Sequence, residues 1–454
     1  MLTLAAYFTS APGSISFDAS TKKFSDADIA KVQKCSIDNL HMDLSFLEDA
    51  TPIKAEEFIH RRDRLAQALH TDGVDAFVLE PGYTFQYYGN VSQWDWEPWE
   101  PEERPFLMVM QPTVGLDGTV KAKTTYLAPH FEEDRVRMLG IPADSELDIV
   151  IWEEHWDPYQ TLLEQTFDRR EGLVIMTDEE MRDYIVRGLT SAGFHTVGLT
   201  PNVDAVRQQK SPAELSLLRA VNTGTVEALR KMRPCLIPGL TENQVMTILD
   251  NALLSVPGFG LFFNIVLFDE NAALPHGGKA TGGKTLTHHT VVLIDVGAHY
   301  RGYSSDICRS FLIDPPRGQT PEGVAASDPQ FATKQKVFDT VLAAQNASIA
   351  HFRPGETAAS VDVAARSVIA KQGWEKQFTH RVGHGIGIKA HESPYLHKGN
   401  TRVKLREGMT FTSEPGVYLT GRFGVRSEDV FVVTERGSEV RCLSGPRAKG
   451  FWEP

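Results

Sequence analysis

The sequence predicts a smaller α/β domain followed by a larger α+β domain, in which helices cover one face of a largely antiparallel sheet. Two observations predict this fold class. In the first half of the chain, amphipathic helical segments alternate with short apolar strands, which is the pattern of an α/β domain. In the second half, long helical segments precede and interrupt several strand-like segments joined by turns. The chain has 454 residues, enough for two or three domains with buried cores.

The first domain is predicted over residues 51–205, after an N-terminal extension (1–50) that is turn-rich and shows no sustained periodicity. Residues 55–70 carry apolar side chains at helical spacing, and Gly73 is suited to ending that helix. The apolar run at 74–80 then predicts a buried strand. Weaker signals predict strands at 124–129, 147–152 and 173–177, and a helix near 178–191.

A tryptophan-rich segment, residues 94–105, interrupts this alternation. It contains three tryptophans, five acidic residues and three prolines. Prolines at this density exclude a regular element. We expect the segment to pack its tryptophans on the domain, while a pocket lining and a contact in a dimer are the alternatives.

The second domain is predicted over residues 206–454, after a polar connection. Ser211 is suited to capping a helix, because Pro212 would occupy the first helical position and Glu214 follows three residues after the cap. This helix is predicted to extend over 212–232. The next segments are predicted to be a helix capped at Thr241, strands at 259–268, 290–300 and 308–313, and helices at 329–351 and 356–372.

Charge and apolar patterning exclude several classes of function. The formal net charge of −13 opposes nonspecific binding to nucleic acid and to an anionic membrane, because both need an excess of Lys and Arg. No run of 18 apolar residues occurs, so the sequence predicts no membrane span. The N-terminal apolar run is short and has no preceding basic residue, which favours a cytoplasmic protein. A secretory leader trimmed at this point is the alternative.

The four cysteines do not predict a metal site. None of them forms a C-x-x-C pair, which excludes a thiolate zinc site of the usual spacing. Their even number permits disulfides, but four in 454 residues do not make a disulfide scaffold. We expect structural or inert thiols at Cys35, Cys235, Cys308 and Cys442.

Two aspartates lie at the ends of apolar segments. Asp295 ends the run VVLID, where a buried carboxylate is costly unless it is paired or bound to a metal ion. Asp306 follows eleven residues later, beside another predicted strand. Two aspartates on successive strands of a hairpin would converge on one site. Ion pairs with Arg301 or Arg309 are the alternative explanation of either residue.

A histidine-rich segment and two glutamates extend this set of potential metal ligands. His380, His384 and His391 occur close together and are separated by glycines, which let the backbone approach a ligand closely. Glu414 and Glu428 each adjoin an apolar strand segment. A lone histidine more often completes a polar network than binds a metal, so that alternative stays open for each histidine.

Two aspartates, two glutamates and His384 are too many ligands for one open zinc site. They suit two divalent cations that share bridging carboxylates and hold a hydroxide between them. Because oxygen ligands predominate, we expect Mn²⁺, with Zn²⁺, Co²⁺ or Fe²⁺ as alternatives.

The order of these residues resembles that of the pita-bread metallopeptidases, a family that includes methionine aminopeptidase, aminopeptidase P and prolidase. The segments DVGAHYRGYSSDICRSF, SEPGVY and VRSEDV resemble the family's aspartate and glutamate motifs, and ALPHG resembles its substrate-histidine motif. Residues 380–392 fit its proline-peptidase signature except at Ala390, where Ile or Val is usual, and Cys308 stands where Thr is common. The resemblance is strong over residues 210–440. The first domain resembles, more loosely, the N-terminal domain of aminopeptidase P, prolidase and creatinase, which methionine aminopeptidases generally lack.

The resemblance implies that the second domain has the pita-bread fold, a curved and mostly antiparallel sheet covered by helices. It also assigns the five ligands between two metal ions: Asp295 would hold one ion, His384 and Glu414 would hold the other, and Asp306 and Glu428 would bridge them. The attacking water would lie between the ions, and Glu414 would accept its proton.

The resemblance further implies a group of residues that contact the substrate or orient the ligands. His276 and His391 would contact the substrate and stabilise the oxyanion or pass a proton to the leaving nitrogen. His380 matches a pocket histidine of the family. The orienting groups would be Glu392, Tyr418 and Arg426.

The implied function is hydrolysis of Xaa-Pro peptide bonds by attack of a metal-bridging hydroxide, as an Xaa-Pro aminopeptidase or an Xaa-Pro dipeptidase. The implied substrates are short peptides with proline at the second position, and a homodimer is also implied. Two alternatives are a non-peptidase reaction on the same fold, such as creatinase-like C–N hydrolysis or a lyase reaction, and a ligand-binding module. The presence of all five ligands argues against the metal-free creatinase branch and against modules that have lost the ligands.

Overall fold

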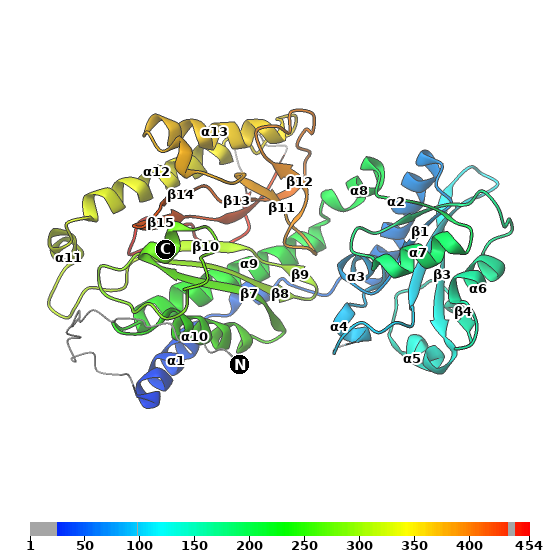
Figure 1. Cartoon of the computed structure of the whole chain (residues 1–454), viewed down its shortest axis with the longest axis horizontal. Coiled ribbons are helices and arrows are strands. Elements are labelled where there is room, and N and C mark those ends of the chain that lie inside the picture. The colour runs from blue at the N-terminus through cyan, green and yellow to red at the C-terminus, as the bar shows by residue number, and fades with distance from the viewer. Residues whose placement is uncertain (1–24, 98, 435–440) are drawn as a thin grey trace, which may run out of the picture.

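The computed structural model describes residues 25–97, 99–434 and 441–454, which form two units of different size. Figure 1 shows the smaller unit on the right and the larger unit on the left. The mixed α/β architecture with an N-terminal and a C-terminal domain, predicted from the sequence, is confirmed. In the described part of the chain, no helix is long and apolar enough to cross a membrane.

The smaller unit is built on one mixed sheet. Its elements are α2 (Ala55–Asp72), β1 (Ala76–Leu79), α3 (Tyr83–Gly89), α4 (Gln93–Trp96), β2 (Leu107–Val114), β3 (Val120–Pro129), α5 (Glu133–Met138), β4 (Asp148–Trp152), α6 (Pro158–Thr166), β5 (Val174–Thr177), α7 (Asp183–Ser191), β6 (His195–Val197) and α8 (Pro201–Gln208). The six strands have the order β4-β3-β2-β1-β5-β6. Strand β2 pairs antiparallel with β1 and β3, and the other neighbouring pairs are parallel.

Each face of this sheet is covered by helices. Alternate residues of β1 point to opposite faces, as in any strand, so that Phe77 packs with Leu65 of α2 while Val78 packs with Leu162 of α6. Helix α8 lies against α2 and contributes Val203 to the first of these two cores. The smaller unit is therefore a three-layered α/β structure, and α8 belongs to its packing.

The N-terminal extension forms a helix, which its lack of sustained periodicity did not predict. Helix α1 (Asp26–Leu40) begins at Ser25, whose side chain forms a capping box with Asp28. It buries Val32, Ser36 and Leu40, which are spaced four residues apart and form one narrow stripe. This stripe packs on the larger unit rather than on the smaller unit that follows it in sequence. The first 24 residues of the predicted extension lie outside the described part of the chain.

A disulfide joins α1 to the larger unit. Cys35 and Cys235 are bonded across a sequence separation of 200 residues. The expectation of structural or inert thiols is therefore wrong for this pair. The spacing of two distant cysteines gives no sign that they pair, so the sequence alone could not show the bond. Cys308 and Cys442 are free.

The larger unit consists of helices packed on antiparallel strands. Its elements are α9 (Pro212–Met232), α10 (Glu242–Leu254), β7 (Phe259–Phe268), η4 (Asp269–Ala273), β8 (Val292–Tyr300), β9 (Tyr303–Ser304), β10 (Ile307–Phe311), α11 (Pro321–Ser327), α12 (Phe331–Ile349), α13 (Ala358–Lys371), β11 (Gly383–Gly385), β12 (Glu392–Leu396), β13 (Thr410–Ser413), β14 (Gly416–Leu419), β15 (Phe423–Arg426), β16 (Asp429–Val432) and β17 (Arg441–Cys442). One sheet has the order β10-β8-β7, a second has the order β12-β11-β13-β16-β17, and β14 pairs with β15.

Each sheet has its own pair of covering helices. Helices α9 and α10 pack on β7 and β8 around Ile294, Val296 and Ala298, whereas α12 and α13 pack on the second sheet around Phe411 and Phe431. Figure 1 shows these two helical pairs on opposite sides of the strands. The two sheets meet where Cys308 of β10 bridges to Glu428 beside β16, and the predicted ligands lie on or next to strands of both sheets.

A candidate metal centre between the two sheets

The five predicted ligands come from both sheets of the larger unit. Asp295 lies on β8, at a position that alternation turns away from α9 and α10. Asp306 directly precedes β10, and His384 lies on β11. Glu414 follows β13, and Glu428 lies between β15 and β16. All five positions are at or next to strands, so the scaffold that holds them is rigid.

Strand β10 brings the two sheets together at the site. Cys308 on β10 is the register partner of Asp295 on β8. On its other side, the carbonyl oxygen of Cys308 accepts a hydrogen bond from the backbone N–H of Glu428 at 2.9 Å. The thiol of Cys308 is buried, and burial raises its pKa well above the ordinary value. The side chain is thus a neutral packing group behind the ligands, as expected from the sequence.

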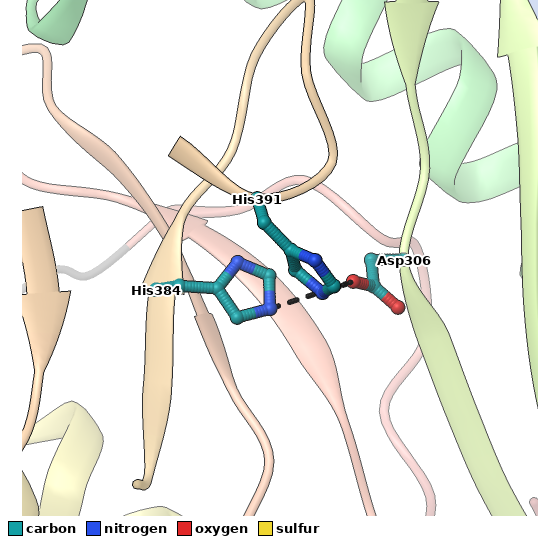
Figure 2. A group of neighbouring side chains, drawn as sticks. All are labelled: Asp306, His384 and His391. Carbon is teal, nitrogen blue, oxygen red and sulfur yellow. Dashed lines mark ion pairs between the residues drawn. The ribbon is translucent and has the colours of Figure 1, made fainter. Parts of the chain in front are cut away.

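The side chains converge into three overlapping groups of potential ligand atoms. Within each group the atoms lie no more than 4.8 Å apart, and the groups are Asp306, His384 and His391; His384, Glu414 and Glu428; and Asp295, Asp306 and Glu428. The Nε2 atom of His384 lies 3.3 Å from Glu414 Oε1 and 3.5 Å from Asp306 Oδ2. Figure 2 shows His384, His391 and Asp306 pointing toward one another.

The carboxylates of this cluster are compensated only in part, by the ion pair of Arg426 with Asp295. Asp295 Oδ1 and Glu428 Oε1 are buried and have no hydrogen-bond partner among the residues that the structure describes. Burial, together with the repulsion from Asp295, raises the pKa of Asp306 well above its ordinary value. Burial and the charge of Asp306 do the same to the pKa of Glu428. Buried acids with unpartnered oxygens are the donor set that a hard or borderline divalent cation binds, so these residues fit the metal that the sequence predicts.

His384 is oriented as a metal ligand. Its Nδ1 atom lies 3.0 Å from the carbonyl oxygen of Gly385, to which a proton on Nδ1 is donated. This leaves Nε2 free to face the carboxylates. Burial opposes ionisation of Glu414, but the hydrogen bond and charge of His384 lower its pKa to about 2. Glu414 is therefore a carboxylate at neutral pH.

A chain of hydrogen bonds links Asp295 to Arg426, Tyr418 and His380. Arg426 Nη2 donates to Asp295 Oδ2 at 2.6 Å, and Arg426 Nη1 donates to the hydroxyl of Tyr418 at 2.7 Å. The Tyr418 hydroxyl lies 2.8 Å from His380 Nε2. These three residues thus form one chain of contacts that ends at Asp295, and the roles that the sequence assigned to them stay predictions. Arg426 also donates to the carbonyl oxygen of Pro275 at 3.1 Å, which ties the segment carrying His276 to the site.

Two of the predicted substrate residues lie on the accessible side of the cluster. The side chain of His391 is 60% exposed, and its Nε2 atom lies 3.6 Å from Asp306 Oδ2. Partial loss of hydration and the neighbouring His384 lower the pKa of His391 to about 4, so the imidazole is neutral at pH 7. His276 is exposed and lies close enough to contribute to the electrostatic field at Asp295 and His391.

Glu392 stands apart from the metal-ligand groups. It forms a buried ion pair with Lys210, which lies between α8 and α9. The sequence predicted Glu392 as an orienting residue, but it did not point to Lys210. No local pattern could have done so, because the two residues are 182 positions apart.

Two tryptophans of the tryptophan-rich segment have different surroundings: one packs in the core and the other lines a cavity. Trp96 is buried and its ring lies 4.3 Å from that of Phe106, which matches the packing expected for the segment. Trp94 instead lines a cavity of about 500 Å³ together with Tyr83 and His299. His299 lies on β8 four residues beyond Asp295, so this cavity lies along the same strand as the metal cluster.

Comparison with known proteins places the chain among peptidases. The profile of metallopeptidase family M24 matches residues 216–435. An uncharacterized peptidase of Schizosaccharomyces pombe is 34% identical over 94% of this chain and 90% of its own length. The probable dipeptidase PepE of Mycobacterium tuberculosis is 30% identical over 84% of this chain and 94% of its own length.

Solved structures show the same relationship. Dipeptidase PepE from Mycobacterium ulcerans superposes with a TM-score of 0.71 at 27% identity, covering 87% of this chain and 98% of that one. A prolidase from Thermococcus sibiricus superposes with a TM-score of 0.69 at 26% identity, with the same coverage of both chains. With its pita-bread fold and its carboxylate and histidine cluster, the chain belongs to metallopeptidase family M24, whose members depend on divalent metal ions.

Proposed function

We propose that this protein is a di-metal exopeptidase that hydrolyses Xaa-Pro bonds in short peptides, as an Xaa-Pro dipeptidase or an Xaa-Pro aminopeptidase. The observation that carries the two-metal proposal is the overlap of the ligand groups. Glu428 belongs both to the group with Asp295 and Asp306 and to the group with His384 and Glu414. One carboxylate shared by two adjacent groups is the arrangement expected for two cations held side by side.

In this proposal the residues divide into ligands and groups that act on the substrate. Asp295 would hold one cation, His384 and Glu414 the other, and Asp306 and Glu428 both. The bound cations would lower the pKa of a water molecule and polarise the scissile carbonyl, and Mn²⁺ is the proposed metal. The count and the identity of the metal ions are both part of the proposal.

The chain's own residues would move the protons and hold the substrate. Glu414 is ionised at neutral pH and exposed enough, at 16%, to accept a proton from water. His391 is neutral and faces the same space, so it would donate a hydrogen bond to the substrate oxygen or pass a proton to the leaving nitrogen. His276 would contact the substrate from the opposite segment, and His380 would line the pocket behind Tyr418.

Proline specificity is supported by the relatives, since one similar structure is named a prolidase. Others are named dipeptidases without reference to proline. A dipeptidase of broader specificity is therefore the second candidate function. The homodimer and the substrates with proline at the second position are likewise proposed.

The proposal is tested by peptide hydrolysis with metal-stripped protein, with and without added Mn²⁺. The substrates are Ala-Pro, Ala-Pro-Ala and Ala-Ala, and the Glu414→Ala variant is the control. We expect Mn²⁺-dependent release of proline from Ala-Pro by the wild-type protein only. Cleavage of Ala-Pro-Ala would identify an aminopeptidase. Equal turnover of Ala-Ala would establish the broader dipeptidase, and no turnover of any peptide would contradict the proposed function.

A further inference from the structure

The segment that carries His391, residues 386–393, is held by both units of the protein. On the side of the larger unit, Ser304 donates hydrogen bonds to two backbone carbonyls of this segment, at 3.0 and 2.9 Å. On the side of the smaller unit, Lys389 forms an ion pair with Glu180 at 3.0 Å. The backbone that places His391 therefore depends on contacts from two different domains.

A buried ion pair between Lys210 and Glu392 holds the end of the same segment. The two side chains are 2% and 5% exposed, and Glu392 directly follows His391 in the chain. The ammonium group also donates to the carbonyl oxygen of Arg207 at the end of α8, at 2.6 Å. Lys210 reaches Glu392 because Gly387 lies between them, where a β-carbon would come within 2.6 Å of Lys210 Cε.

Helix α8 provides a second anchor beside the first. The side chain of Gln208 donates to Ser393 Oγ at 3.0 Å, and the Ser393 hydroxyl in turn donates to the carboxylate of Asp204. Another face of the helix carries Val203, which is packed in the core of the smaller unit. Helix α8 therefore connects the core of the smaller unit with the two residues that follow His391. Figure 1 shows the helix between the two units.

The side chain of His391 has little packing of its own. It is 60% exposed, so its position is set mainly by the backbone to which it is attached. We propose that Lys210 and Glu392 are positioning residues that hold His391 over the metal centre, so that the smaller unit fixes the geometry of the substrate-facing histidine. Only the kinetic tests of this inference rest on the proposed function.

The first test is Lys210→Met. Because a displaced His391 would still leave the metal ligands in place, we expect kcat to fall about 10- to 100-fold while the Mn²⁺ content stays at the wild-type level. The matched control is Lys334→Met, which removes another buried lysine from an ion pair with Asp328, at side-chain exposures of 8% and 7%. Lys334 lies in the first turn of α12, which follows α11. Figure 1 shows α11 on the far side of the larger unit from α8, so the kcat of this control variant should be unchanged.

A double-mutant cycle tests whether Lys210 acts through His391. In a His391→Gln background, Lys210→Met should cause no further loss of kcat, because the group that it positions is already gone. If the two losses multiply, Lys210 does not act through His391 and the inference is overturned.

The effect of Lys210→Met on stability must be separated from its effect on the position of His391. An unpaired buried charge destabilises a protein whether or not the residue positions another group. Lys210→Met leaves Glu392 unpaired, and we expect the Tm to fall by about 5 °C. In the double variant Lys210→Met/Glu392→Gln the charge is removed, so most of the Tm should return while kcat stays low. Recovery of kcat together with the Tm would show that the pair is only structural and would overturn the inference.

Hydrogen–deuterium exchange of the metal-free protein gives a readout without catalysis. We expect the amides of residues 386–393 to exchange about tenfold faster in Lys210→Met than in the wild type, and at the wild-type rate in Lys334→Met. If the wild type hydrolyses no peptide, the proposed function fails, but this measurement still tests whether Lys210 and Glu392 hold the segment that carries His391. Unchanged exchange in Lys210→Met would overturn the inference even in an active enzyme.

Discussion

At the candidate metal centre, individual carboxylates repel one another when no cation is bound. Asp295, Asp306 and Glu428 are buried, and burial raises the pKa of each above its ordinary value. Folding the metal-free protein therefore favours the protonated acids, whereas binding a cation favours the ionised ones.

Replacing a shared ligand should affect metal binding and metal-free stability in opposite directions. Glu428→Gln removes a carboxylate that belongs to two ligand groups, so we expect Mn²⁺ affinity to fall by about 100-fold or more. The metal-free variant should be more stable than the metal-free wild type by about 1 kcal/mol, because folding no longer has to bury or protonate that carboxylate. Calorimetric titration and urea unfolding would measure the two effects. The control is Glu227→Gln, which removes the carboxylate of an ion pair with Arg230. It should change neither the Mn²⁺ affinity nor the free energy of unfolding of the metal-free protein.

The stability of the metal-free protein should depend on pH with a defined sign. These acids have raised pKa values in the folded state, so the folded protein binds more protons than the unfolded chain above about pH 4, where ordinary carboxyls ionise. The contribution of these acids to the free energy of unfolding is fully present below about pH 4. It is lost as the pH rises through their raised pKa values in the folded state. Thermal unfolding from pH 5 to 8 should show the gap in Tm between Mn²⁺-loaded and metal-free protein widening with pH. A constant gap would contradict ionisation of these acids on metal binding.

Among the secondary-structure elements, those with complete local signals were predicted best. Helix α9 covers the predicted range, because Ser211, Pro212 and Glu214 mark its start. Strand β2 was missed because Pro112 argues against a central strand. In the structure, Pro112 lies in the arm of the hairpin with β3, beyond the three residues that pair with β1, so its missing N–H costs no bond on that side.

Helix α1 and its packing on the larger unit could not be predicted from the sequence. Its amphipathic stripe is narrow, and the surface that it covers is formed by α9 and α10, about 200 residues away. The ligand set was predicted because each ligand lies in a recognisable local motif. Lys210 was not predicted, because its importance comes only from the distant Glu392.

The disulfide should stabilise the attachment of α1 without affecting chemistry. We expect Cys35→Ser to lower the free energy of unfolding by about 2–5 kcal/mol and kcat to stay at the wild-type level, since α1 packs on the outer side of α9 and α10. A reducing agent should lower the Tm of the wild type and leave the variant unchanged. Cys442→Ser, which removes a free cysteine, is the control and should retain the response to reductant. Equal Tm values in oxidised and reduced wild type would contradict the expectation.

For the whole molecule, the exposed aromatic side chains favour self-association. Trp94 is 74% exposed, and Phe262, which stacks on His299 beside the same cavity, is 42% exposed. Because exposed apolar groups of this size often mark interfaces, we expect a homodimer with twice the chain mass of 50.4 kDa. Light scattering after size-exclusion chromatography would measure the mass, and Trp94→Ser with Phe262→Ser should shift it toward the monomer. Leu116→Ser, exposed on the β2–β3 turn, is the control. A monomeric wild type would exclude the dimer.

The tether of α1 also has a consequence for synthesis of the chain. Cys35 leaves the ribosome 200 residues before Cys235, and the whole smaller unit is made between them. At about 5–20 residues per second, the helix waits roughly 10–40 s for its partner surface. During that interval its apolar stripe and its thiol are open to wrong partners. The native partner of Cys35 therefore becomes available only after the whole smaller unit has been synthesised.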